Sequence, residues 1–148
     1  MPIFKVLKYN PKDGGEPYFR EFEVPTHKGM TVLEGLYHIL EQQYPTLAFR
    51  SSCRQGVCGS CAMHINGMYR LACETQIAAM GEHITVRPLA HMTVIRDLVV
   101  DMEPFFRQYE AIKPYLIPAQ QPGEKEYLQR SEERRVGKEG KSGGSADQ

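Results

Sequence analysis

The sequence predicts an α+β domain of modest size, built from short strands, one helix and one long loop. Three observations carry this prediction: strand-like runs separated by turn residues, a helical period after Thr31, and a cysteine-rich stretch without periodicity at residues 50–61. The chain has 148 residues, which is enough for one domain of ordinary size and a fraction of another.

The first two strands are predicted to form an N-terminal hairpin. Residues 3–9 mix apolar and basic side chains in a strand-like run, and residues 18–24 alternate apolar with acidic side chains. The segment Asn10–Gly15 between them is dense in turn-forming residues. We therefore expect two strands joined through a Gly-rich turn.

A helix is expected directly after this hairpin. Thr31 is a suitable N-cap, and Glu34 completes the capping-box pattern three residues later. Pro45 ends the helical pattern. The apolar positions that fall at helical spacing are Val32, Leu36, Ile39 and Leu40.

The rest of the domain is predicted to be a loop, a second hairpin and a last strand. Residues 50–61 are rich in Gly, Ser and Cys and read as a loop. Strand-like residues 62–65 and 68–72 flank Asn66-Gly67, which is a strong hairpin turn. Residues 83–88 form the last strand of this prediction.

The region after the last strand is predicted to be helical. Apolar spacing over residues 92–102 indicates a helix that Pro104 interrupts, and a second helical piece is expected over 105–112. The bulky apolar side chains of this second piece have little remaining sequence to cover them, so we expect them to be exposed. Asp97 and Asp101 lie one helical turn apart, and we expect them on a solvated helix face.

All four cysteines of the chain lie between residues 53 and 73. Three of them follow a C-x4-C-x2-C spacing, and eleven residues separate the third cysteine from the fourth. This core spacing is that of plant-type ferredoxins, and four thiolates are what a [2Fe–2S] cluster requires. In a reducing compartment such a cluster of cysteines is more often a metal site than a pair of disulfides. The candidate ligands are Cys53, Cys58, Cys61 and Cys73.

The residues between the cysteines suit the same chemistry. Gly56 and Gly59 supply the backbone freedom that a loop needs to curl around a cluster. Exposed backbone N–H groups in such a loop donate to sulfur, which stabilises the reduced state and raises the reduction potential. Arg50 and Arg54 bring positive charge to a site that carries negative charge.

Other metal and redox sites match the pattern less well. Tetrahedral zinc usually takes two C-x2-C pairs, and this chain has only one such pair. A Rieske centre needs two histidine ligands, whereas all four positions here are cysteine, and His64 is expected to be a surface or packing residue. A thioredoxin-like dithiol would leave Cys53 and Cys73 unused. A structural zinc protein remains a remote alternative.

Composition excludes several function classes. Lys and Arg number 18 against 18 Asp and Glu, and this neutral balance argues against a nucleic-acid binder. No apolar run is long enough to span a membrane. The N-terminus lacks the apolar core of a secretory signal, so we expect a protein of the cytoplasmic side. Neither a phosphate-binding loop nor a paired nucleophile and base points to substrate chemistry in this chain.

Longer motifs resemble a known family. The segments Ser52–Met63, Leu71–Thr75, Val94–Met102 and Ile112–Leu116 are similar to the iron–sulfur subunit of succinate dehydrogenase and fumarate reductase. The resemblance covers residues 1–129. Ordinary plant-type ferredoxins place the fourth cysteine further along and lack the Arg-Asp-Leu-Val-Val-Asp segment.

The resemblance implies a β-grasp domain over residues 1–103, with the four cysteines as ligands of a [2Fe–2S] cluster. Some relatives place Asp at the third ligand position, where this chain has Cys61. In the family, electrons come from a flavoprotein (FAD) subunit and pass through [4Fe–4S] and [3Fe–4S] clusters in a helical second domain to quinone. The ligands of these further clusters are absent, because no cysteine follows Cys73.

The resemblance also implies partners, a location and a domain division. The expected complex includes a membrane-anchor subunit and lies at the cytoplasmic face of the inner membrane, with no direct membrane span by this chain. Residues 104–129 are expected to be the beginning of a truncated helical second domain. Fumarate reduction and a stand-alone [2Fe–2S] ferredoxin remain the alternative functions.

The last segment, residues 130–148, is expected to be disordered and non-native. It contains no aromatic residue, Leu, Ile or Met, which is typical of disorder. Within it, Arg130–Glu139 matches the in-frame translation of a common sequencing adapter. On this hypothesis the natural gene was cut near Gln129.

Overall fold

The computed structural model describes residues 1–117 of the chain. The chain divides after Ile112, and every helix and strand given below lies within Met1–Ile112. The predictions for residues 118–129 and 130–148 lie outside the described residues.

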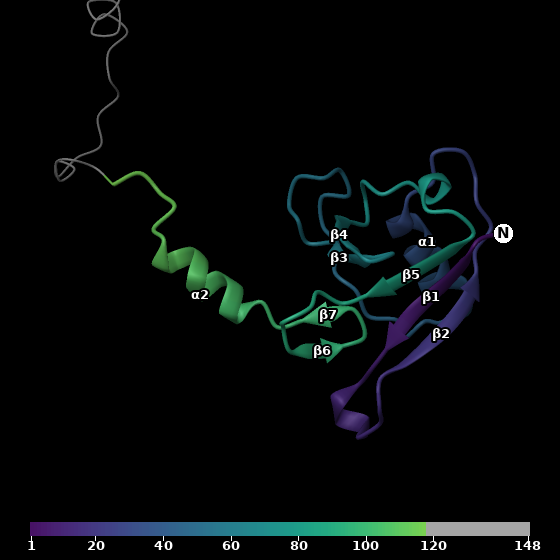
Figure 1. The fold of residues 1–148 in the computed structure, drawn as a ribbon, viewed down its shortest axis with the longest axis horizontal. Helices are drawn as coiled ribbons and strands as arrows, with labels where there is room; N and C mark the ends of the chain where they lie inside the picture. Colours follow the sequence, from purple (N-terminus) through teal and green to yellow (C-terminus); the bar gives the residue numbers. More distant parts are fainter. Residues whose placement is uncertain (118–148) are drawn as a thin grey trace, which may run out of the picture. The chain divides into compact units, whose positions relative to one another are not determined.

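A five-stranded sheet forms the body of the domain, in the order β2-β1-β5-β3-β4 (Figure 1). β1 is antiparallel to β2 and parallel to β5, while β3 is antiparallel to both β4 and β5. Both predicted hairpins are therefore confirmed. The strand bounds are β1 Ile3–Lys8, β2 Tyr18–Glu23, β3 Ala62–Ile65, β4 Met68–Leu71 and β5 His83–Arg87.

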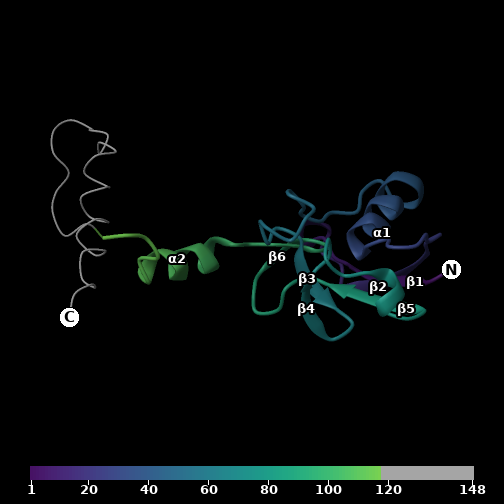
Figure 2. The same cartoon turned by 90° about the horizontal axis from the view of Figure 1, so that it is seen from above.

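The predicted helix is also confirmed and lies over one face of the sheet (Figure 2). α1 spans Val32–His38 and continues as a π-helical turn, η2, over Ile39–Gln43. At its start, Thr31 and Glu34 form the reciprocal capping box. Short 3₁₀ turns complete the domain at Pro11–Asp13 (η1) and Ile77–Ala79 (η3).

The core lies between α1 and the sheet. Each side chain that is fully buried there stabilises the fold by about 1.5–3 kcal/mol. The packing is so close at Gly35 that an added Cβ would lie 2.5 Å from the Phe4 ring. Fully buried apolar residues come from every layer: Phe4, Val6, Leu36, Ile39, Met63, Ile65, Ile84 and Val86.

The helix predicted over residues 92–102 is wrong. The segment forms a two-stranded hairpin instead, with β6 at Val94–Arg96 and β7 at Val99–Val100. Asp97 at the bend has a positive φ of 47°, which no α-helix accepts. Its backbone N–H donates to the Tyr9 carbonyl at 2.7 Å, and that of Leu98 donates to the Ala48 carbonyl at 3.1 Å. Hydrogen bonds to distant segments therefore stabilise a hairpin here, although the spacing of apolar residues favours a helix.

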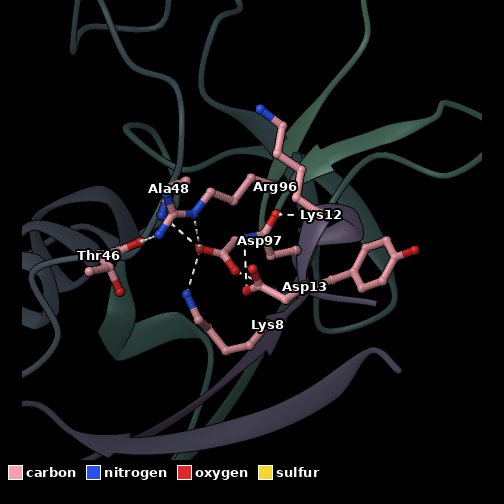
Figure 3. A network of polar contacts seen from close by, with 9 residues as sticks. Lys8, Lys12, Asp13, Thr46, Ala48, Arg96 and Asp97 are labelled. Atoms are coloured by element: carbon pink, nitrogen blue, oxygen red, sulfur yellow. Dashed lines mark hydrogen bonds and ion pairs between the residues drawn. The ribbon is translucent and has the colours of Figure 1, made fainter. Parts of the chain in front are cut away.

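The expectation that Asp97 lies on a solvated face is also wrong, since its side chain is buried. The Asp97 carboxylate pairs with the Lys8 ammonium at 2.5 Å, and both side chains are at most 4% exposed. It also accepts from the backbone N–H groups of Tyr9 at 3.1 Å and Ala48 at 3.0 Å (Figure 3). A buried charge requires such partners, and here they connect β1, the 46–48 segment and the β6–β7 bend. Asp101 is only half-buried and accepts from the Glu103 N–H at 3.0 Å.

The second helical piece is confirmed as α2, Glu103–Ala111. None of its residues is buried in the described part of the chain. This agrees with the expectation that the apolar side chains of this helical piece are exposed. Phe105, Phe106 and Tyr109 are each 45–52% exposed, and Ile112 is 74% exposed. Among residues 1–117, no helix is long and apolar enough to cross a membrane.

Candidate metal centre

The β3–β4 hairpin brings two of the four cysteines together. Cys61 directly precedes β3 and Cys73 follows β4, and the Ala62–Leu71 register places them at the same end of the hairpin. Their Sγ atoms lie 3.3 Å apart, and both residues are buried, with 3% and 7% exposure. Two thiolates on one tetrahedral metal with bonds of about 2.3 Å lie about 3.8 Å apart. The spacing of this buried pair is therefore close to what one metal ion needs.

The other two cysteines lie on the loop before β3 and are accessible. Cys53 is half-buried and Cys58 is exposed. They face each other, because the Cys58 N–H donates to the Cys53 Sγ at 3.2 Å and the Cys53 N–H donates to the Cys58 Sγ at 3.4 Å. Cys53 and Cys58 thus form a second, exposed pair.

Backbone N–H groups of the loop point at the sulfurs. Besides the two bonds within the exposed pair, Cys53 Sγ accepts from Gln55 at 3.5 Å and Val57 at 3.3 Å. The Ser60 N–H donates to the Cys58 Sγ at 3.4 Å. Donors around a sulfur stabilise its negative charge, as a metal-bound thiolate requires.

The loop can aim its amides in this way because its backbone turns left-handed at three positions. Arg54, Gly56 and Gly59 have φ values of 59°, 73° and 72°. For Arg54, a residue with a Cβ, this conformation costs about 1–3 kcal/mol. Gly56 also donates its N–H to the Cys73 Sγ at 3.2 Å, so it links the exposed loop to the buried pair.

One thiol of each pair has a pKa that departs from that of an ordinary cysteine, and the two shifts are opposite in direction. Hydrogen bonds from the Ser60 side chain and from the Cys53 and Ser60 backbone lower the pKa of the Cys58 thiol to about 6. Burial, with the Cys61 thiol beside it, raises the pKa of Cys73. Cys58 is thus prepared as a thiolate, the form that binds metal.

The donor set fits a two-iron cluster. Within residues 1–117, no three His, Cys, Asp or Glu side chains converge on one point as ligands of a single ion. The cysteines lie instead as two pairs, and a [2Fe–2S] cluster takes two thiolates on each iron. Six backbone N–H groups donate to three of these sulfurs, on Cys53, Cys58 and Cys73.

The charged residues singled out from the sequence have distinct places. Arg54 donates from Nη2 to the Tyr37 hydroxyl at 3.2 Å, and its guanidinium lies 4.7 Å from the centre of the Tyr37 ring. Arg50 is exposed and lines a cavity of about 570 Å³ beside Cys58. His64, predicted to be a surface or packing residue, is half-buried and packs edge-on against Tyr69.

Sequence reasoning missed the contact of Tyr37 with this loop. Tyr37 lies within the predicted helical stretch between Thr31 and Pro45, but nothing in the sequence says which loop a helix side chain reaches. A polar-tipped aromatic residue on an otherwise apolar helix face was the one available signal.

The comparisons with known proteins agree with this geometry. Residues 3–107 match the family model described as "2Fe-2S iron-sulfur cluster binding domain". The chain belongs to this family, and its fold is the β-grasp ferredoxin-like fold predicted above. The expectation of a [2Fe–2S] cofactor is thereby confirmed, while the assignment of individual ligands stays a prediction.

Relatives narrow the resemblance to one kind of subunit. The chain is 43% identical to the succinate dehydrogenase iron-sulfur subunit of Coxiella burnetii over 133 residues, covering 88% of this chain and 56% of the relative. It is 40% identical to the fumarate reductase iron-sulfur subunit of Haemophilus influenzae over 118 residues, covering 80% and 46%. The chain spans about half the length of these curated relatives.

A solved structure supports the same resemblance as the curated relatives. A chain of the Mycobacterium smegmatis Sdh1 complex in the apo form superposes with a TM-score of 0.72 at 31% identity, covering 93% of this chain and 57% of that one. The resemblance to succinate dehydrogenase and fumarate reductase iron–sulfur subunits is therefore confirmed.

Proposed function

We propose that this chain is the electron-transfer iron–sulfur part of a succinate:quinone oxidoreductase. The ligands in this proposal are Cys53, Cys58, Cys61 and Cys73. When bound, a [2Fe–2S] cluster supplies a one-electron carrier. The observation that carries the proposal is the arrangement of the four cysteines as two pairs, with backbone N–H groups of the loop donating to their sulfurs.

The residues of the chain bind and tune the group rather than react with substrate. The buried pair excludes water from one side, and the loop amides stabilise the added negative charge of the reduced state. The chain itself holds no nucleophile and base pair for carbon chemistry among the motifs of its sequence. Succinate oxidation therefore belongs, in this proposal, to a flavoprotein subunit that delivers electrons.

The partners and location follow from the same family. A flavoprotein subunit lies upstream, and quinone lies downstream beside a membrane-anchor subunit. The complex lies at the cytoplasmic face of the inner membrane, with this chain peripheral to it.

Fumarate reduction is the second candidate, favoured by the 40% identity to a fumarate reductase subunit. The exposed apolar side of α2 (Phe105, Phe106, Tyr109) disfavours a stand-alone ferredoxin.

The test has two stages. The chain is first purified without oxygen and analysed for iron, zinc and acid-labile sulfide, with about two irons and two sulfides per chain expected. Zinc without sulfide would contradict the cluster. The chain is then mixed with a succinate dehydrogenase flavoprotein subunit and succinate, and the reduced cluster is followed by EPR.

The expected result is succinate-dependent reduction of the cluster in the mixture only. The chain alone is expected neither to oxidise succinate nor to reduce quinone. Quinone-linked turnover of succinate by the isolated chain would refute this division of labour. The C58S variant, mixed in the same way, is the matched control and is expected to give no EPR signal.

A further inference from the structure

The hydroxyl of Tyr37 on α1 contacts the chain on both sides of Cys53. Its oxygen lies 2.5 Å from the Ser51 Oγ, two residues before the cysteine. It also accepts a hydrogen bond at 3.2 Å from the Arg54 Nη2, one residue after the cysteine. Because Arg54 has only donors, the tyrosine accepts there and its own proton is free for Ser51.

The Tyr37 ring is held firmly enough to act as an anchor. It packs edge-on against Phe49, with ring centroids 5.1 Å apart and planes at 82°. The Arg54 guanidinium carbon lies 4.7 Å from the ring centroid, which is cation–π distance. Tyr37 is half-buried on a regular helix, whereas the loop that it contacts contains no strand or helix.

The backbone of the loop around Cys53 and Arg54 has a conformation that requires support from outside the loop. Arg54 has a φ of 59°, a conformation that residues with a Cβ rarely adopt. Directly beside it, Cys53 Sγ accepts the N–H groups of Gln55, Val57 and Cys58 at 3.2–3.5 Å. These three bonds exist only while residues 53–58 keep their curl.

We propose that Tyr37 is a positioning residue for Cys53: through Ser51 and Arg54 it holds the curl of the loop in which backbone amides donate to the Cys53 sulfur. The proposal rests on the assignment of Cys53 as a cluster ligand. Tyr37 touches no ligand atom, so its effect passes through the loop. It sets how firmly the cluster is retained and how far its reduction potential is raised.

The direction of the effect follows from charge. Reduction adds an electron to a site that is already negative, and N–H donors to sulfur stabilise that state. Loosening the loop lengthens these hydrogen bonds, so the midpoint potential falls. It also opens the exposed side of the site to chelators.

The experiment compares Y37F with Y18F in the cluster-loaded chain. Y37F removes one oxygen and keeps the ring against Phe49, while Tyr18 is 53% exposed at the start of β2 and provides a matched loss of hydroxyl. The midpoint potential is measured by EPR-monitored redox titration, and iron loss is measured as the rate of transfer to a chelator.

For Y37F we expect two- to tenfold faster iron loss. We also expect a two- to tenfold shift of the redox equilibrium toward the oxidised form, which is about 18–59 mV for one electron. Y18F is expected to match the wild type in both measurements. A Y37F variant with wild-type potential and iron retention would overturn the proposal.

The S51A variant separates positioning from charge and serves if Y37F fails to load. Ser51 carries no charge, so a shift in S51A in the same direction supports positioning, and a wild-type potential in S51A overturns it. In Y37F/S51A the two effects should not add, because both residues act through one contact. If the wild-type chain carries no [2Fe–2S] cluster, the ligand assignment fails instead, and that outcome is recognised before any variant is compared.

Discussion

The two cysteine pairs are organised by different means. Cys61 and Cys73 are buried at the end of the β3–β4 hairpin, where strand register sets their separation. Cys53 and Cys58 lie on an accessible loop, where amide donors and left-handed backbone set their positions. The sheet therefore prepares one half of the site, and a strained loop prepares the other.

This difference indicates which cysteine pair is harder to displace. Displacing the buried pair requires disturbing a packed hairpin, and the cost of that is shared by the whole core. Displacing the exposed pair requires only a local rearrangement, and such segments open at low free energy. We therefore expect stability to depend on the buried side, and cluster retention and potential to depend on the exposed side.

The largest expected effect is the loss of a ligand from either pair. C58S should reduce cluster content more than about tenfold and leave the β-sheet intact, because Cys58 is exposed. C73S should lose the cluster equally and also weaken the fold, because Cys73 is buried and a hydroxyl placed there costs about 1–3 kcal/mol if it finds no partner. Acid-labile sulfide, visible absorption and urea unfolding measure the two effects. Visible absorption like that of the wild type in C58S would contradict the ligand assignment.

Next in size is the buried ion pair that anchors the segment entering the exposed loop. D97N keeps the shape of Asp97 but leaves the Lys8 ammonium without its counter-charge at 3% exposure. Removing one member of such a pair costs about 3–5 kcal/mol. Since Asp97 also accepts from Ala48, the segment that leads toward Cys53 should loosen as well. Urea unfolding of the variant measures the stability.

The control for this pair is D13N, a change of the same kind at an exposed aspartate nearby (Figure 3). Its cost should stay within about 0.5 kcal/mol. Equal stabilities of D97N and D13N would show that the ion pair does not support the domain.

The sequence was sufficient for the parts of the fold that local patterns specify. The capping box of Thr31 and Glu34 and the Asn66-Gly67 turn predicted α1 and the β3–β4 hairpin. The cysteine spacing predicted the cluster type, since spacing within one loop is itself a local property. Each of these signals lies within a few residues of the element that it predicts.

The failures came from interactions between distant residues. The apolar period at 92–102 is compatible with a helix, and only hydrogen bonds to Tyr9 and Ala48 make the segment a hairpin. Asp97 looked solvated because its partner Lys8 lies 89 residues away. The contact of Tyr37 with Arg54 was missed for the same reason.

Glycine substitutions test how the exposed loop communicates with the buried pair. G56A and G59A each place a Cβ at a φ near 73°, which costs about 1–2 kcal/mol. At Gly56 that Cβ would also meet the Glu74 side chain at 2.6 Å, whereas at Gly59 nothing lies within 4 Å. Of these two glycines, Gly56 is the one whose N–H donates to the buried pair, at the Cys73 sulfur. G56A should therefore lose iron to a chelator faster than G59A, and equal rates would remove Gly56 as the link between the pairs.

The smallest expected effect lies on the helix that supports the buried side. Beyond the Thr31 cap, α1 donates from Val32 to the Thr75 carbonyl at 2.8 Å and from Leu33 to the Ala72 carbonyl at 3.0 Å. These bonds fix the backbone on both sides of Cys73. T31A removes the cap and should cost about 1 kcal/mol of stability, with cluster content near that of the wild type. T26A, on an exposed loop, is the matched control.

The cost of T31A should also depend on pH in a definite direction. The Thr31 backbone N–H and hydroxyl donate to the Glu34 carboxylate and lower the pKa of Glu34 below its ordinary 4.5. A lowered pKa stabilises the fold above the ordinary value, and this contribution is lost as the pH falls through the lowered one. T31A gives up the hydroxyl part of it, so its deficit in urea unfolding should be largest above pH 4.5 and should shrink in acid. A deficit that grows in acid would mean that the Thr31–Glu34 contact is not what fastens α1 to the backbone around Cys73.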